Sequence, residues 1–135
     1  KGVGFVAFVP TEDAGEKVAK KAGAFNLPFP VLADPKQAAA EAFRAVVTPE
    51  AFVLDHNHVV RYRGRIDNQY YGRMKKNPQV TEHDLRNALE AIVSGKDVPT
   101  PATRAIGCHI DPKERTVTSD AVTYHRDVAP ILQKH

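Results

Sequence analysis

A proline inside an apolar, β-rich run places the strongest constraint on how this chain folds. Residues 45–55 read AVVTPEAFVLD, a composition typical of a buried strand, and Pro49 lies within it. Proline has no N–H to donate to a sheet ladder, so it occurs at strand starts, edges and bulges. The run therefore predicts a core strand that follows Pro49, with the proline at its entrance.

The residues before this run predict one strand and two helices. Residues 3–10 are short, apolar on both faces and β-favouring, which is typical of a strand covered on both sides. An amphipathic stretch predicts a helix over residues 11–25, and a loop is expected over 26–35. Asp34 is placed to cap a second helix over residues 36–44.

The residues after Pro49 predict a hairpin and a third helix. Two β-favouring segments, residues 51–55 and 59–67, flank a short polar turn, which is the pattern of a β-hairpin. Thr81 is placed to cap a helix whose apolar stripe continues to Val93. The expected order is β-α-α-β-β-α, an α/β fold with a mixed sheet and helices on its faces.

The length of 135 residues suits one domain with a tail. Residues 1–98 contain the periodic segments and form the expected domain. Residues 99–135 are rich in proline, threonine and charge without a sustained period, so they predict an extended tail or linker. The longest apolar run, residues 3–10, is far too short for a membrane span.

Positive charge is only mildly in excess, with a formal net charge of +3. The cations form two local clusters, which are Arg61, Arg63 and Arg65, and Arg73, Lys75 and Lys76. No aromatic platform or nucleic-acid-binding fingerprint accompanies this charge. The clusters therefore indicate a solvated surface, and no nucleic-acid partner is expected.

A longer string carries a family resemblance. Residues 27–67, LPFPVLADPKQAAAEAFRAVVTPEAFVLDHNHVVRYRGRID, contain an F-P-x-L-x-D segment, a short helix, a T-P-E-x-F-x-x-D segment and a hairpin, in that order. This order resembles the second half of a redoxin domain, in the AhpC/TSA peroxiredoxin-like and thiol-disulfide oxidoreductase branch of the thioredoxin-like fold. The resemblance covers about residues 1–98.

The resemblance implies a thiol site beside Pro49. In that family the proline follows a cis peptide bond, and the residue before it lies next to the redox cysteine. Thr48, Pro49 and Glu50 would then form the wall of the site. Arg63 and Arg65 are further candidates to face the thiolate. The residues alone leave an alternative open, in which a trans Pro49 simply begins the strand.

The cysteine that this site requires is missing from its expected place. The family carries C-x-x-C or a peroxidatic cysteine at a helix N-terminus, where the helix dipole stabilises the thiolate. Here no cysteine precedes Cys108, so a dithiol mechanism is not open to these residues. We therefore expect that the chain, which begins at Lys1, is a fragment that lacks the first βα unit of the fold. An open sheet edge would then favour dimerisation.

Cys108 is the only cysteine of the chain and its redox candidate. Its position in a proline-rich segment also suits an inert cysteine or an interchain disulfide. A copper or other metal site is a further alternative, with the ligand set His56, His58, Cys108 and His109. The two histidines also suit a solvated hairpin turn.

The last residues, VTYHRDVAPILQKH, resemble the lead-in to a c-type haem segment. With the missing first unit, this suggests a piece of a larger redox protein located outside the cytoplasm, and no cofactor held by this chain itself.

Two functions remain open. In the first, the parent protein is a thiol-disulfide oxidoreductase or peroxiredoxin-like enzyme that acts on a thiol or disulfide protein or on a peroxide. In the second, the chain is a non-catalytic thioredoxin-fold interaction module of a larger haem- or copper-containing redox protein.

Overall fold

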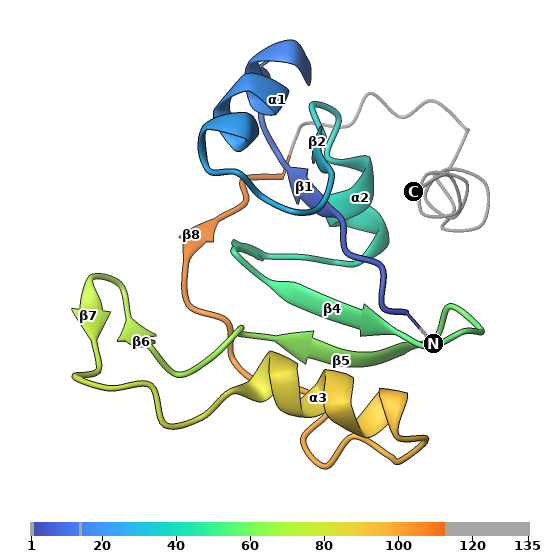
Figure 1. Ribbon diagram of the computed structural model, residues 1–135. Coiled ribbons are helices and arrows are strands. Elements are labelled where there is room, and N and C mark those ends of the chain that lie inside the picture. The colour runs from blue at the N-terminus through green and yellow to red at the C-terminus, as the bar shows by residue number, and fades with distance from the viewer. Residues whose placement is uncertain (1, 14, 113–135) are drawn as a thin grey trace. The chain divides into compact units, whose positions relative to one another are not determined.

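The computed structural model describes residues 2–13 and 15–112, which form two compact units. The first unit contains the described residues up to Ala45 and those after Ile110, and the second is Val46–Ile110. Small sheets and three helices make up the described residues, a mixed α/β composition that is consistent with a thioredoxin-like fold (Figure 1). None of these helices is long and apolar enough to cross a membrane.

The first unit is built around a parallel strand pair. β1 (Ala7–Val9) and β2 (Val31–Ala33) align with Ala7 opposite Val31. Helix α1 (Gly15–Ala24) makes the connection that a parallel pair requires. The expected loop over residues 26–35 therefore contains a strand. Nearby prolines hide it in the sequence, although Val31, Leu32 and Ala33 form a short apolar run.

Asp34 fixes the start of the next helix. Its buried carboxylate accepts hydrogen bonds from the backbone N–H groups of Ala39 and Ala40, both at 3.1 Å. Helix α2 spans Ala38–Ala42 and is shorter than the expected 36–44, because Gln37 has a left-handed φ of 56°. The carboxylate thus stabilises the positive end of the helix as expected of a cap, from outside its first turn.

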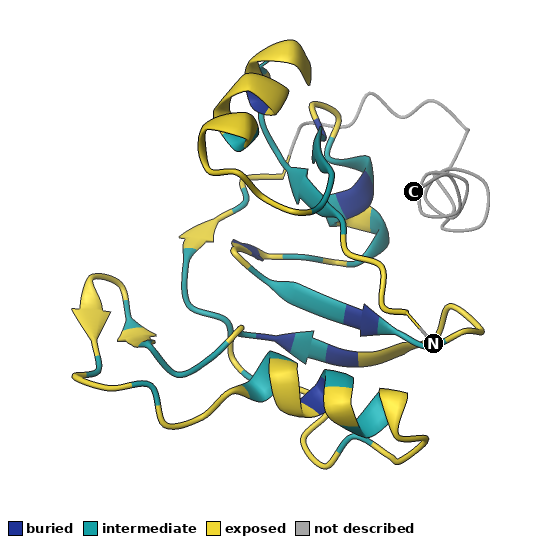
Figure 2. Cartoon of the chain, viewed as in Figure 1, coloured by how far each residue is buried: buried dark blue, intermediate teal, exposed yellow. Residues whose placement is uncertain are grey.

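The second unit contains the predicted hairpin and the core. β4 (Ala51–Leu54) pairs with β5 (Val60–Gly64) in an antiparallel ladder, with Val53 opposite Tyr62. Helix α3 (Asp84–Val93) packs on this hairpin through Ala88 (Figure 2). The partly buried residues around this core are Ala51, Leu85, Leu89, Ile92 and Val98.

Helix α3 begins later than its sequence predicts. His83, not Thr81, occupies the N-cap position, and its side chain makes no capping hydrogen bond. The Thr81 hydroxyl instead accepts a hydrogen bond from the Asn68 amide at 2.7 Å. Asp84 is likewise directed to Arg65 rather than back to the helix start. Long-range partners therefore take the place of the expected local cap.

The segment after α3 returns along the second unit. Arg63 and Ala102 form a parallel bridge, and the Thr103 N–H donates to the Arg63 carbonyl at 3.0 Å. Farther along, β8 (Cys108–His109) pairs antiparallel with β3 (Val47–Thr48). Residues 101–110, assigned to the tail by their composition, thus add two short pairings to this unit. A separate small hairpin, β6 (Tyr70–Gly72) and β7 (Lys75–Lys76), completes it.

Candidate functional site

The predicted site wall runs from Thr48, the last residue of β3, to Glu50, which directly precedes β4. The Thr48–Pro49 peptide bond is cis, and both residues are exposed. The preceding residue, Val47, is buried, and β4 begins at Ala51. The proline therefore separates two short strands instead of interrupting one, which accounts for its place within an apolar run.

Glu50 holds this connection in place by accepting two hydrogen bonds. Its side chain is only 6% exposed and its Oε1 accepts a hydrogen bond from Arg63 Nη2 at 2.8 Å. The other oxygen, Oε2, accepts the backbone N–H of Val46 at 3.2 Å. The Arg63 guanidinium also lies over the Phe52 ring, 5.4 Å from its centroid. One carboxylate thus ties both ends of the 46–50 segment to β5.

Cys108 lies directly across from Thr48 in the β3–β8 register. The Ile110 N–H donates to the Val46 carbonyl at 3.0 Å, which extends the pairing by one step. A Cβ on Gly107 would lie 2.2 Å from the Thr48 carbonyl oxygen, so only glycine permits this approach. The exposed thiol-bearing residue is therefore a neighbour of the wall within the same unit.

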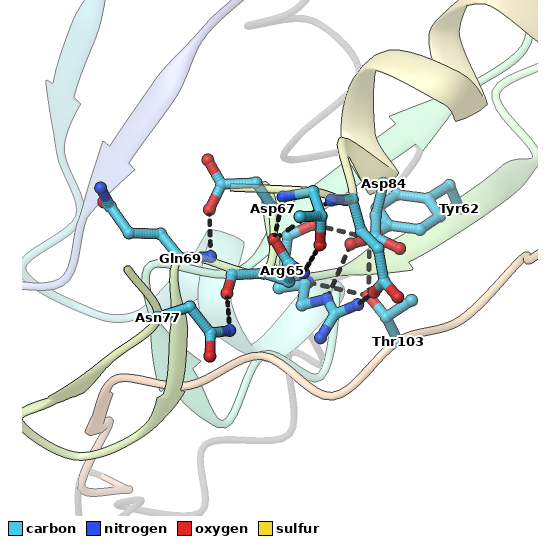
Figure 3. Close-up of polar contacts among 10 residues, drawn as sticks. Tyr62, Arg65, Asp67, Gln69, Asn77, Asp84 and Thr103 are labelled. Carbon is cyan, nitrogen blue, oxygen red and sulfur yellow. Dashed lines mark hydrogen bonds and ion pairs between the residues drawn. The ribbon is translucent and has the colours of Figure 1, made fainter. Parts of the chain in front are cut away.

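Arg65 is occupied by a different network (Figure 3). Its Nε donates to Asp84 Oδ2 at 2.7 Å, and Nη2 forms an ion pair with Glu82. The hydrogen bond that Arg65 donates to Asp84, together with the nearby carboxylate charges, raises the pKa of Arg65. This arginine fastens the start of α3 to the end of β5.

Tyr62 is the buried centre of that network. It is fully buried, and its hydroxyl donates to the Arg65 carbonyl at 2.6 Å. The same hydroxyl lies 2.6 Å from Thr103 Oγ1. Burial raises the pKa of Tyr62, partly offset by the Thr103 hydrogen bond. The network joins β5, α3 and the returning segment (Figure 3).

The residues of the predicted metal site are spread over two elements. His56 and His58 lie in the turn between β4 and β5, whereas Cys108 and His109 form β8. Across residues 2–13 and 15–112, no group of three or more His, Cys, Asp or Glu side chains is arranged to hold a metal ion.

The role of the 106–110 segment was missed in the sequence. Ile106, Cys108 and Ile110 alternate with smaller or polar residues, a period of two that is typical of a strand. Gly107 was the second signal, since glycine within such a run marks a close backbone approach. Both signals were obscured by the prolines and charges on either side.

The comparisons with known proteins agree with the family resemblance. Residues 1–63 match the profile of the AhpC/TSA family, which confirms the resemblance to redoxins and includes the wall residues Thr48, Pro49 and Glu50. No curated protein matches the chain significantly.

Two solved structures resemble this chain over most of its length. A hypothetical protein from Sinorhizobium meliloti superposes with a TM-score of 0.71 and 32% identity over 83% of this chain. An uncharacterized conserved protein from Geobacillus kaustophilus gives a TM-score of 0.71 and 32% identity over 85%. The chain spans 63% of the first and 62% of the second protein.

Proposed function

We propose that the chain contributes the proline-containing wall of a redoxin-type thiol site, in a protein that performs thiol-disulfide exchange or peroxide reduction. The AhpC/TSA match that includes Thr48, Pro49 and Glu50 carries this proposal. The contact of Arg63 with the covered Glu50 carboxylate supports it, because this contact holds the wall in one position.

The chemistry needs a thiolate nucleophile within reach of Thr48. In disulfide exchange the thiolate attacks one sulfur of a disulfide, a mixed disulfide forms, and the other sulfur leaves as a thiolate. Cys108 is the only cysteine of the 135 residues, so it is the only thiol of this chain that can take part. A single thiol forms the mixed disulfide but has no second thiol to resolve it. The 135 residues alone should therefore react once and should turn over only as fast as an added dithiol resolves the mixed disulfide.

The experiment compares the 135-residue chain with the complete product of its gene. Insulin-disulfide reduction and peroxide consumption are measured for both, with dithiothreitol as the reductant. We expect the complete product to turn over much faster than the chain, for which dithiothreitol is the only resolving thiol. Pro49→Ala in the complete product should lower the rate by about 10- to 100-fold, because the wall is displaced. An inactive complete product, or an unaffected Pro49→Ala variant, would overturn the proposal.

The second candidate is a non-catalytic redoxin-fold interaction module. The absence of cysteine from residues 1–107 favours it. This module should remain inactive in both assays, as the complete product and as the 135-residue chain. A stable complex with a haem- or copper-containing redox protein, measured by calorimetry with the purified partner, would then establish it.

A further inference from the structure

The two basic clusters of the chain have different environments. Every arginine of the first cluster is paired: Arg61 with Asp55 and Asp97, Arg63 with Glu50, and Arg65 with Asp84 and Glu82. The second cluster is Arg73, Lys75 and Lys76, in the β6–β7 hairpin. Among the described residues none of these three cations has an ion-pair partner or a side-chain hydrogen bond. The sequence stretch 68–81 that contains them has no Asp or Glu.

The same hairpin exposes its large apolar side chains. Tyr70 is 45% exposed, Tyr71 61% and Met74 92%. Figure 2 colours most of the hairpin as exposed. The hairpin lies beyond the ends of β5 and α3 within its unit (Figure 1). Met74 has a φ of 60°, so it occupies the left-handed region at the tip of the turn. Two exposed tyrosines therefore lie beside this cationic cluster on the expected solvated surface.

Hydrogen bonds hold the base of the hairpin in place. The Asn77 side chain donates to the Asn68 carbonyl at 2.6 Å, and the Asn77 N–H donates to the Gln69 carbonyl at 2.8 Å (Figure 3). The Asn68 side chain in turn accepts the N–H groups of Thr81 and Glu82 at 3.0 and 3.1 Å. This bonding orients the exposed residues before any partner arrives, which lowers the entropic cost of binding.

We propose that the β6–β7 hairpin is a docking element for an acidic protein surface that offers an apolar pocket. Tyrosine, methionine and arginine are the residue types enriched at protein interfaces, where an apolar anchor is surrounded by a polar rim. Met74 and Tyr71 supply the anchor, and the three cations supply the complementary charge. Three cations on one turn form no stripe along which a nucleic-acid backbone lies, so a protein is the favoured partner. The inference does not rest on the proposed thiol chemistry.

The test uses the 135-residue chain and a defined probe, a short fluorescein-labelled peptide that combines glutamates with leucines. Binding is measured by fluorescence anisotropy at physiological salt, beside a peptide with lysine in place of glutamate and a single-stranded oligonucleotide. We expect the chain to bind the acidic peptide in preference to both other probes. Equal or tighter binding of the oligonucleotide, or no binding of the acidic peptide, overturns the proposal.

A matched pair of triple variants separates local from global charge. The hairpin variant is R73E/K75E/K76E, and the control is R86E/K96E/R104E, three exposed cations elsewhere in the same unit. Each variant changes the formal net charge from +3 to −3, because three cations become three anions. The hairpin variant should weaken the peptide affinity by about tenfold or more, and the control should weaken it far less. Equal losses would overturn the proposal.

The apolar part of the proposal has its own variant, Tyr71→Ser with Met74→Ser. Because neither side chain is buried, the thermal transition of this variant should match that of the wild type. The affinity for the acidic peptide should fall severalfold, since the anchor is lost. An unchanged affinity would show that charge alone governs binding and would overturn the proposal of a docking element with an apolar anchor.

Discussion

Arg63 holds a carboxylate that the rest of the protein covers. The Glu50 side chain is 6% exposed, whereas that of Arg63 is 40% exposed, and their closest atoms are 2.8 Å apart. Glu50 also accepts the Val46 N–H, so the pair secures the segment that contains Thr48 and Pro49. Because the anion is the buried partner, the two residues have unequal effects on stability. Loss of Arg63 leaves the covered Glu50 carboxylate without its cation, whereas loss of Glu50 leaves a guanidinium that reaches solvent.

Replacing Arg63 with methionine should lower the free energy of unfolding by about 1–3 kcal/mol, because the Glu50 carboxylate loses its cation while it stays covered. Glu50→Gln should cost less, since the amide oxygen still accepts one hydrogen bond and no charge remains buried. Urea unfolding followed by circular dichroism gives both values.

The double variant E50Q/R63M provides the control for this pair. It removes the unpaired negative charge of residue 50, so it should be more stable than Arg63→Met alone. If the double variant lowered the free energy of unfolding by the full sum of the two single variants, the role assigned to the buried carboxylate would be contradicted.

Tyr62 should make the protein sensitive to alkaline pH. Burial raises the pKa of Tyr62 above the ordinary tyrosine value of 10.0. The folded state therefore retains the phenol proton after the unfolded state has released it. The stabilisation is complete below about pH 10 and is lost as the pH rises through the folded pKa. Absorbance titration near 295 nm should show one tyrosine that ionises later than the others and only with unfolding.

Tyr62→Phe separates this effect from the other tyrosines. It removes the hydrogen bonds to Arg65 and Thr103 and should cost about 0.5–1.5 kcal/mol at neutral pH. Its free energy of unfolding should also vary less between pH 9 and 11 than that of the wild type. Tyr71→Phe, at an exposed position, should change neither quantity.

Asp55 should stabilise the protein at neutral pH, and this contribution should be lost in acid. Its carboxylate accepts the backbone N–H of Val59 at 3.0 Å and that of Asn57 at 2.9 Å. These hydrogen bonds, with Val59 the larger influence, lower the pKa of Asp55 below 3.8. The contribution is present above the unfolded pKa and is lost as the pH falls through the folded pKa. In acid, the free energy of unfolding should depend less on pH in Asp55→Asn than in the wild type. Asp97→Asn should leave this dependence unchanged.

The sequence predicted those parts of the fold whose signals are local. The hairpin of β4 and β5 follows from strand alternation around a polar turn, and α3 follows from its apolar stripe. β2 was missed because Pro28 and Pro30 precede a strand of only three residues. A strand this short is defined by its partner β1 more than by its own composition.

The site was predictable only in part, for a similar reason. Pro49 marked the position of the wall, and Glu50 was named as its neighbour. The contact from Glu50 to Arg63 and that from Arg65 to Asp84 depend on strand register and on helix packing, which one sequence does not specify. The pairing of Cys108 with Thr48 joins residues about sixty positions apart, so no local pattern reveals its partner.

Gly107→Ala should release β8 from the wall. The added Cβ would lie 2.2 Å from the Thr48 carbonyl oxygen, and this oxygen belongs to the backbone, so the segment has to move away. The Ile110 N–H, which donates to the Val46 carbonyl, should then exchange with deuterium faster than in the wild type. The Asp55 and Val59 amides at the hairpin turn should exchange at the same rate as in the wild type, because β4 and β5 do not depend on β8.

Gly95→Ala is the matched control, since a Cβ there meets nothing within 4 Å and any loss of stability arises from its φ of 69° at the end of α3. If Gly107→Ala left exchange at Ile110 unaltered, the close approach of this segment to Thr48 would be refuted.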